Sequence, residues 1–357
     1  MKILCFIDSL GSGGAQRQIV GLAVLLKQKG YEVKVCTYYK NEFYKPYLDE
    51  NDVSYEIIPN AANTKTRIWA VTQYFKREEP DWVIAYQETP SLVACAARLL
   101  GCKFKLLVSE RNTTQKVGWN ERVRFMLYHL ADAIVPNSYS QEKWLIQHHP
   151  WMKDKITTIT NFVDLEKFHH LEHSRHGIPE IVVAASIWES KNTLGLIKAL
   201  AILKKRNVKC HVFWYGKSEL NIGYFYKSLD LIKEFRLEEY IDLLPKTNNI
   251  INVYQQADYF CLPSLYEGTP NVLCEAIACG LPAIVSDVCD NRRYVDDGKN
   301  GVLFNPNEPS DIADKIASFI SQTEDEYNIC CYNSRKKAET TLSETSFINK
   351  YIQIIES

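Results

Sequence analysis

Short apolar runs alternate with amphipathic stretches along most of the chain. In the first half, the apolar runs that predict strands are residues 2–8, 31–39, 81–87, 104–110 and 133–138. The stretches with helical spacing between them are residues 15–30, 91–101 and 120–133. Apolar strands that alternate with helices are typical of a parallel sheet covered on both faces. The pattern therefore predicts an α/β fold.

The same pattern starts again in the second half. Its predicted strands are residues 180–187, 209–216, 240–245, 258–264 and 281–287, and its predicted helices include 193–207 and 271–280. The stretch between the halves, residues 161–180, has no clear periodicity. We interpret the chain as two doubly wound domains, residues 1–165 and 166–338. A C-terminal helix within residues 339–357 is expected to pack back toward the first domain.

The composition fits this interpretation and excludes several classes of protein. A chain of 357 residues is long enough for two or three domains, and 46% hydrophobic with 24% charged residues is ordinary for a globular protein. A formal net charge of −1 gives no overall field toward nucleic acid. No apolar stretch has the length of a membrane span or of a signal peptide. We expect a cytoplasmic protein.

Cysteine and histidine offer no convincing metal site. The 11 cysteines are scattered through apolar runs without zinc-like spacing, which indicates buried thiols in a reducing compartment. Four histidines, His169, His170, His173 and His176, fall in the irregular stretch between the domains. No carboxylate–histidine set is spaced on one face there, so a solvated linker is favoured over a metal centre.

Ligands of open parallel sheets bind at the carboxyl ends of the strands, so the loops there are the places to look for chemistry. The first such loop, "DSLGSGGAQRQ", brings Gly13 and Gly14 to the start of a helix, where backbone N–H groups can face an anion. A dinucleotide-binding fingerprint would need a glycine or alanine where Gln16 stands. This counts against a nicotinamide dehydrogenase, and a tight structural turn remains the alternative.

Two loops of the second domain carry charged residues beside helix starts. Lys191 precedes a helix that Asn192 or Thr193 could cap, an unfavourable place for a cation unless an anion lies nearby. Glu267 precedes the helix that follows "EGTPN", and Glu275 lies about one turn inside it. The N–H groups of residues 268–272 can hold phosphate oxygens, while the carboxylates accept from sugar hydroxyls. Solvated surface charges are the alternative.

In this context, "EGTPNVLCE" resembles the paired-glutamate signature of the retaining family-4 glycosyltransferases, which have a GT-B fold of two Rossmann-like domains facing each other across a cleft. "LPSLYEGTPNVLCEAIACGLPAIVSD" and the following "DNRRYVDDGKNGVLFNPNEPSDIADKI" resemble the family's donor-domain segment. "GSGGAQRQ", "ADAIVPNS", "ITNFVDLEKF" and "ESKN" are similar to its other motifs. The resemblance covers essentially the whole chain.

The resemblance implies that the second domain binds a sugar nucleotide and the first domain the acceptor. Lys191 would neutralise the leaving diphosphate, and Glu267 would contact the donor sugar at the reacting face; these two are the expected catalytic residues. Further expected donor contacts are Gly13, Gly14, Ser186, Gly268, Thr269, Pro270, Asn271 and, on the nucleotide ribose, Glu275. The resemblance implies no cofactor, because the sugar nucleotide is itself a substrate. It also implies no obligatory metal, and in agreement no Asp-x-Asp triplet ends a predicted strand.

Ser186 departs from the family pattern, which usually has an arginine five residues before its lysine. One cation for the diphosphate is therefore missing from its usual place. Either Lys191 suffices, or another residue such as Arg17 or Arg111 reaches the site. Arg292 and Arg293 resemble a structural loop of the family and are assigned no role.

On the acceptor side, the resemblance draws attention to "SERN", which is Ser109, Glu110, Arg111 and Asn112. This stretch resembles that of family members acting on sugar linked to polyprenyl diphosphate. Arg111 would bind an acceptor phosphate and Glu110 an acceptor hydroxyl. Ordinary structural ion contacts are the equally weighted alternative.

Residues 65–78 and 116–130 mix basic and aromatic side chains, as interfacial helices do. Peripheral contact with the cytoplasmic face of the inner membrane is one interpretation. Packing of the same aromatic residues in the domain core is the favoured one.

The predicted function is a retaining hexosyltransferase of capsule, O-antigen or exopolysaccharide synthesis. It would move a hexose or N-acetylhexosamine from a nucleotide-diphosphate sugar to a saccharide, expected to be linked to polyprenyl diphosphate. A sugar-nucleotide epimerase of the same fold and a non-catalytic sugar-nucleotide-binding protein are the alternatives. No nucleic-acid partner is expected.

Overall fold

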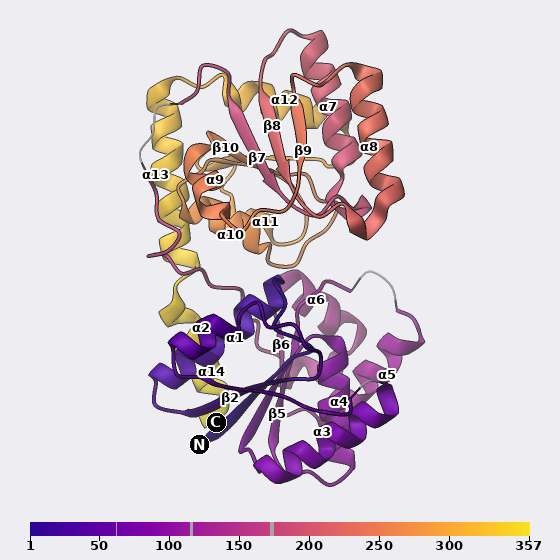
Figure 1. Cartoon of the computed structure of the whole chain (residues 1–357). Helices are drawn as coiled ribbons and strands as arrows, with labels where there is room; N and C mark the ends of the chain where they lie inside the picture. The colour runs from indigo at the N-terminus through magenta and orange to yellow at the C-terminus, as the bar shows by residue number, and fades with distance from the viewer. Residues whose placement is uncertain (62, 115–116, 172–174) are drawn as a thin grey trace. The chain divides into compact units, whose positions relative to one another are not determined.

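The computed structural model describes residues 1–61, 63–114, 117–171 and 175–357 (Figure 1). The chain forms two compact units. Unit 1 consists of Met1–Phe162 together with Glu344–Ser357, and unit 2 of Val163–Ser343. The limits that the sequence suggested, 165 and 339, lie a few residues from these positions.

Unit 1 is built on a parallel sheet of six strands in the order β3-β2-β1-β4-β5-β6. The strands are β1 (Lys2–Phe6), β2 (Glu32–Thr37), β3 (Ser54–Ile57), β4 (Trp82–Tyr86), β5 (Lys105–Glu110) and β6 (Ala133–Pro136). The helices are α1 (Gly14–Gln28), α2 (Lys45–Glu50), α3 (Thr64–Glu78), α4 (Glu88–Leu99), α5 (Trp119–Leu127), α6 (Tyr139–His148) and α14 (Glu344–Glu356), with 3-10 turns at Tyr128–Leu130 and Pro150–Lys155.

Alternate residues of the unit 1 strands face two separate cores. Ile3 and Cys5 of β1 belong to the core under α1 and α14, whereas Leu4 and Phe6 belong to the core under α3, α4 and α5. Figure 1 shows these helices on opposite faces of the sheet. Because both faces are covered, the central strands are apolar at nearly every position, which is why the sequence shows them as continuous apolar runs.

The last helix, α14, completes unit 1. Its residues Phe347, Ile348, Tyr351 and Ile355 are buried in the core under α1. Tyr351 and Tyr86 share a hydrogen bond between their hydroxyls at 2.6 Å, and the indole N–H of Trp82 donates to the carbonyl of Ile355 at 3.1 Å. The central strand β4 is therefore anchored to the final residues of the chain.

Unit 2 has a second parallel sheet of six strands, in the order β12-β11-β10-β7-β8-β9. Its strands are β7 (Glu180–Ala184), β8 (His211–Tyr215), β9 (Ile241–Leu244), β10 (Tyr259–Leu262), β11 (Ala283–Ser286) and β12 (Gly301–Phe304). Its helices are α7 (Thr193–Lys205), α8 (Ile222–Phe235), α9 (Ile250–Gln256), α10 (Asn271–Ala278), α11 (Asn291–Tyr294), α12 (Pro309–Ile320) and α13 (Glu324–Thr341), with 3-10 turns at Glu189–Lys191 and Glu219–Asn221.

The unit 2 sheet is also covered on both faces. Ile181 and Val183 of β7 face the core under α7, α8 and α12, while Val182 and Ala184 face the core under α9, α10 and α13. Each unit is thus a doubly wound α/β domain with its own pair of cores, which confirms the predicted fold class of two Rossmann-like domains.

Some elements differ from the sequence-based expectation. The helix expected over 120–133 ends at Leu127, because the chain tightens into the 3-10 turn Tyr128–Leu130 before β6. The strand β3 was missed because it lies at the edge of the sheet, where none of its four residues is fully buried. The irregular stretch after 160 does lack helices and strands in its described part.

The histidines of that stretch make individual contacts within unit 2. His170 lies within hydrogen-bonding distance of the carbonyl of Cys279 at 3.0 Å, and His176 of the buried carboxylate of Asp258 at 3.1 Å. His169 contacts the carbonyl of Glu166 at 3.0 Å, whereas His173 lies outside the described residues. In the part of the chain that the structure describes, no three metal-ligating side chains gather.

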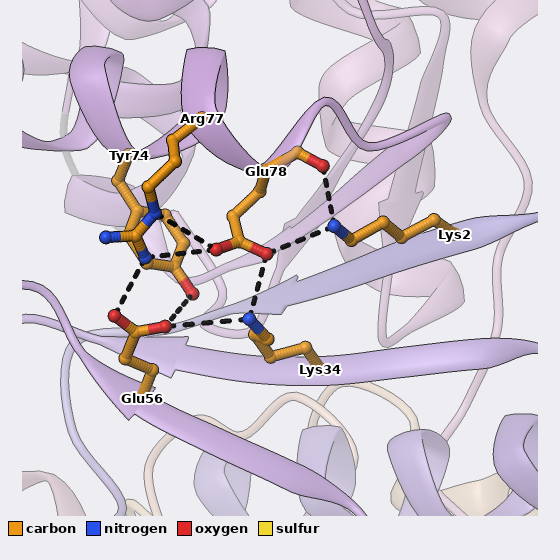
Figure 2. A network of polar contacts seen from close by, with 6 residues as sticks. All are labelled: Lys2, Lys34, Glu56, Tyr74, Arg77 and Glu78. Atoms are coloured by element: carbon orange, nitrogen blue, oxygen red, sulfur yellow. Dashed lines mark hydrogen bonds and ion pairs between the residues drawn. The ribbon is translucent and has the colours of Figure 1, made fainter.

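A polar network joins the end of α3 to the first three strands of the unit 1 sheet (Figure 2). Glu78 accepts from Lys34 at 2.8 Å, from Arg77 at 3.0 Å and contacts Lys2 at 3.1 Å. Glu56 accepts from Arg77 at 2.8 Å and from Tyr74 at 3.1 Å. The network runs from Lys2 at the start of β1 to Glu56, the third residue of β3.

Candidate active site

Each sheet has one point at which the strand order reverses. In unit 1 this point lies between β1 and β4, and in unit 2 between β7 and β10. Open α/β sheets bind ligands outside the carboxyl ends of the strands at such switch points. The loops to examine are therefore those after β1 and β4 in one unit, and those after β7 and β10 in the other.

Lys191 and Glu267 meet at the switch point of unit 2. The Nζ of Lys191 donates to Oε1 of Glu267 at 2.5 Å, with side-chain exposures of 27% and 11%. The backbone also ties the two loops together, because the N–H of Leu265 donates to the carbonyl of Ser190 at 2.8 Å. The structure thus brings together the two residues that the sequence analysis selected as catalytic.

Local backbone geometry positions Lys191. It ends the 3-10 turn Glu189–Lys191, and the next residue, Asn192, has a left-handed φ of 57° and caps α7. The side-chain amide of Asn192 donates to the carbonyl of Pro306 at 2.8 Å. Of the two residues considered as the cap of this helix, Asn192 is therefore the one observed.

The turn after Glu267 leads directly into α10. Pro270 is the N-cap and makes no side-chain capping hydrogen bond, so the first turn of α10 lies at the carboxyl edge of the sheet without a side-chain cap. Thr269 is buried and shares a hydrogen bond with the hydroxyl of Tyr294 at 3.2 Å. Gly268 and Asn271 are half-buried, and Glu275 is 2% exposed within the helix.

Cys289 is a neighbour of Glu267 that the sequence analysis did not select. It follows β11, has a left-handed φ of 47°, and its sulfur lies close to the backbone of Glu267. The residue is exposed, although burial around its sulfur raises the pKa of the thiol, an effect that the backbone of Glu267 opposes. No sequence pattern points to this cysteine, because its proximity depends on how the β10 and β11 loops fold.

The predicted acceptor residues of unit 1 are mostly engaged with their own domain. Ser109 donates to the carbonyl of Val135 at 3.0 Å. Glu110 is buried; it accepts a hydrogen bond from Tyr128 and lies 3.5 Å from Arg124. Burial raises the pKa of Glu110, and the charge of Arg124 opposes this effect.

Arg111 and Asn112 differ in their exposure to solvent. Arg111 is buried, donates to Asn161 and lies 4.6 Å over the ring of Tyr86, whereas Asn112 is exposed. Of the two residues for which structural ion contacts were the alternative, Glu110 makes one with Arg124, whereas Arg111 makes a hydrogen bond and a ring contact. Their role toward an acceptor stays a prediction.

The glycine loop of unit 1 is partly filled by its own helix. Gly13 caps α1 and Gly14 begins it. The side chain of Gln16 folds back so closely that a Cβ on Gly13 would lie 2.2 Å from its Oε1. Its amide donates to Asp8 at 3.1 Å. Gln16 therefore occupies the place where a dinucleotide fingerprint has a small residue.

A second glutamine completes the switch point of unit 1. Gln87 directly follows β4 and has a left-handed φ of 75°. Its side-chain amide, oriented with the nitrogen toward Asp8, donates to the Asp8 carboxylate at 3.1 Å. Asp8 and Gln87 are half-buried. Neither residue is among the candidates predicted from sequence, because a single polar residue after a strand carries no signal of its own.

Of the two candidates named for the cation missing at Ser186, Arg111 is buried and contacts Tyr86 and Asn161 within unit 1. Arg17 donates to the hydroxyl of Tyr44 at 3.4 Å within unit 1. Ser186 itself is half-buried in the loop after β7.

Two family profiles match the chain, and they meet within a few residues of the boundary between the units. The profile described as Glycosyltransferase Family 4 matches residues 12–167, and the one described as Glycosyl transferases group 1 matches residues 167–337.

Relatives of the chain include two proteins named as transferases that act on undecaprenyl-diphosphate-linked sugars. One is the N-acetylgalactosamine-N,N'-diacetylbacillosaminyl-diphospho-undecaprenol 4-alpha-N-acetylgalactosaminyltransferase of Campylobacter jejuni, 29% identical over 80% of either chain. Another is the UDP-Gal:alpha-D-GlcNAc-diphosphoundecaprenol alpha-1,3-galactosyltransferase of Escherichia coli, 32% identical over 51% of this chain and 49% of the relative.

Solved structures with the same fold as this chain include two that superpose over nearly its whole length. HepE of Anabaena, solved in complex with UDP, superposes over 100% of both chains with a TM-score of 0.86 at 18% identity. A glycosyltransferase of Rickettsia africae superposes with a TM-score of 0.85 at 18% identity, over 99% of this chain and 97% of its own. With two family profiles that together run from residue 12 to residue 337 and a doubly wound fold in each unit, the chain belongs to the GT-B glycosyltransferases.

Proposed function

We propose that this glycosyltransferase moves a hexose or N-acetylhexosamine from a nucleotide-diphosphate sugar to a lipid-linked saccharide, with retention of anomeric configuration. The observation that carries the proposal is the pairing of Lys191 with Glu267 at the switch point of unit 2, at 2.5 Å and beside the start of α10. The relatives named above, which act on undecaprenyl-diphosphate-linked sugars, support the acceptor class.

In the proposed complex, the donor diphosphate lies at the N-terminus of α10, where the N–H groups of the first turn and the helix dipole favour negative charge. A lysine has three donors, so Lys191 can hold Glu267 and a phosphate oxygen at the same time. Glu267 and Glu275 accept hydrogen bonds from the sugar and the ribose. Ser186, Gly268, Thr269, Pro270 and Asn271 line the same loops, and Gly13 and Gly14 are the proposed contacts from unit 1.

The proposed chemistry breaks the bond between the anomeric carbon and the diphosphate oxygen. The acceptor hydroxyl forms the new bond on the same face and gives its proton to the departing diphosphate. Negative charge on the leaving group grows in the transition state, so Lys191 and the first N–H groups of α10 stabilise that state more than the bound donor. No resident metal enters this scheme, and the sugar nucleotide is the substrate.

The experiment that tests the proposal is a thermal-shift screen of sugar nucleotides followed by a transfer assay. A ligand that binds only the folded protein adds about 2.7 kcal/mol to its stability at 100 times the dissociation constant. We expect one base and one sugar to stand out, and an α-linked product from an α-linked donor by NMR. A β-linked product would overturn retention. Conversion of the donor without transfer would indicate the epimerase, and binding without turnover a non-catalytic protein.

We also propose a peripheral membrane contact through α5, since a lipid-linked acceptor lies at a membrane surface. Trp119 and Met126 are 77% and 61% exposed, and their spacing puts them on one helix face with the exposed Arg122. Among the described residues, no helix has the length and apolar character to cross a bilayer.

The membrane contact is tested by co-sedimentation with vesicles containing anionic lipid. Wild-type protein should bind at low salt and release at high salt, and Trp119→Ala should bind more weakly. Equal sedimentation with and without vesicles at low salt would rule the contact out.

A further inference from the structure

We propose that Lys217 is a second cation for the donor diphosphate. The inference rests on the proposed function and adds a residue that neither the sequence analysis nor the resemblance selected. It follows from the charge balance of the site, from the position of the β8 loop and from the surroundings of the lysine.

The charges already placed at the site do not balance a diphosphate. Lys191 is neutralised by its contact with Glu267 at 2.5 Å, and Glu275 lies in the helix that follows. A diphosphate ester adds two negative charges, whereas the N-terminus of a helix offers only about +0.5 of an elementary charge. The donor therefore requires at least one more cation near the carboxyl ends of β7 and β10.

Few cations are available there. In the described loops that follow the unit 2 strands, the basic residues other than Lys191 are Lys217 after β8 and Lys246 after β9. Arg292 and Arg293 at the start of the short α11 are paired with Asp287 and Asp290.

The loop after β8 is fastened to the loop that carries Ser186 and Lys191. The carbonyl of Lys217 accepts from the N–H of Ile187 at 2.9 Å, and the carbonyl of Tyr215 accepts from Ala185 at 3.0 Å. Between these bonds the two loops are in direct contact. They leave no room for a side chain at Gly216, because an added Cβ would lie 1.9 Å from the carbonyl oxygen of Ala185. Lys217 is thus held directly beside Ser186.

The surroundings of Lys217 leave its charge available. Its side chain is exposed, and no carboxylate of the described residues forms an ion pair with it. A lysine ammonium sits on a flexible four-carbon stem, so it can turn toward a phosphate on the neighbouring loop. Lys246 lies after the edge strand β9, one strand further from the switch point. Of the two lysines, Lys217 is therefore better placed to contact the diphosphate.

The test compares Lys217→Met with the matched control Lys246→Met. Binding of UDP, GDP and ADP and of the corresponding monophosphates is measured by calorimetry on the full chain. For the diphosphate that binds wild type, Lys217→Met should weaken binding about tenfold, equivalent to about 1.4 kcal/mol. The affinity for the monophosphate should fall less, because the monophosphate carries fewer charges near the lysine. Lys246→Met should bind both like the wild type.

A charge-preserving change and a kinetic measurement complete the test. Lys217→Arg should keep most of the diphosphate affinity, and Lys217→Met should lower kcat/KM for the donor while leaving the acceptor KM unchanged. Diphosphate binding by Lys217→Met equal to that of wild type, or an equal loss in Lys246→Met, would overturn the role of Lys217 alone. If the wild type binds no nucleoside diphosphate, the proposed function fails as well.

Discussion

At the scale of single residues, Lys191 and Glu267 dominate the candidate site. Lysine–carboxylate pairs with this degree of exposure contribute about 0–1 kcal/mol to stability, because water competes for both charges. Their value to the protein therefore lies in the ligand that they hold. Removing either residue should affect the reaction much more than the fold.

We predict that Lys191→Ala and Glu267→Ala each abolish transfer, lowering kcat at least about 100-fold. The thermal transition should move by no more than about 2–4 °C, the shift that 1 kcal/mol causes in a domain of this size. The exposed residues Lys198 and Glu238 provide controls, since Lys198→Ala and Glu238→Ala should keep activity. Substantial activity in both site variants would show that the site is misassigned.

A second residue-scale prediction uses Cys289 as a reporter of donor binding. The other ten cysteines are buried, so a maleimide should label the native protein once, at Cys289. Because burial raises the pKa of this thiol from 9.0, labelling should accelerate with pH up to and beyond pH 9. A saturating nucleoside diphosphate should slow it several-fold, as followed by mass spectrometry.

Cys289→Ser is the control for that measurement and should take up no label under native conditions. The labelled protein should lose transfer activity, because the adduct would lie against Glu267. A labelling rate that the bound nucleotide leaves unchanged would place the donor away from the β10 and β11 loops.

These residues differ in how far the sequence could predict them. Lys191 and Glu267 each stand between an apolar strand and a helix, a local pattern that can be read directly. Glu110 and Arg111 stand in the same kind of place, yet their side chains are taken up by Arg124, Tyr128 and Asn161, which lie 14 to 50 residues further along the chain. Such long-range partners leave no trace in local spacing.

At the scale of secondary structure elements, the predictable ones were those buried on both faces. Strands such as β4 and β10, with every residue buried, appear as unbroken apolar runs. The edge strand β3 has no fully buried residue and so resembles a loop in sequence. Its place depends on pairing with β2 and on the polar network that holds the end of α3.

That network predicts a specific loss of stability in acid. Burial tends to raise the pKa of Glu78, but hydrogen bonds from Lys34, Lys2 and Arg77 outweigh it and lower the pKa from 4.5 to about 2. A carboxylate with a depressed folded-state pKa stabilises the protein above the unfolded-state value. This stabilisation, roughly 1–3 kcal/mol, should therefore be present above pH 4.5 and disappear as the pH falls toward 2.

Urea unfolding of wild type and Glu78→Gln at a series of pH values checks this prediction. The difference in unfolding free energy should be constant above about pH 5 and shrink below pH 4.5. The neighbouring Glu79, exposed at the end of α3, is the matched control, because Glu79→Gln should show no such dependence. A difference that is independent of pH would contradict the role of the network.

At the scale of the whole molecule, each unit carries its own pair of apolar cores. The four apolar clusters divide into two within unit 1 and two within unit 2. Substitutions and ligands should therefore act mainly on the unit that contains them.

Scanning calorimetry should resolve separate unfolding transitions for the two units. Phe347→Ala removes a buried ring that packs 4.5 Å from Phe162, and should destabilise unit 1 by about 3–5 kcal/mol. A bound nucleoside diphosphate should instead raise the transition of unit 2. Asn349→Ala, on the exposed side of α14, is the control. Equal shifts of a single transition by both changes would show that the units unfold together.

The path of the chain also has a consequence for its synthesis. The chain leaves unit 1 at Phe162 and returns to it only at Glu344, so all of unit 2 is an insertion within the first domain. Domains fold as units while a chain emerges from the ribosome. Unit 2 can therefore complete its fold while unit 1 still lacks α14, and the hydroxyl of Tyr86 meets that of Tyr351 only in the last stage. A chain broken off near residue 343 would carry an intact donor-binding fold on an unfinished partner domain, which quality-control proteases can recognise by its uncovered apolar face.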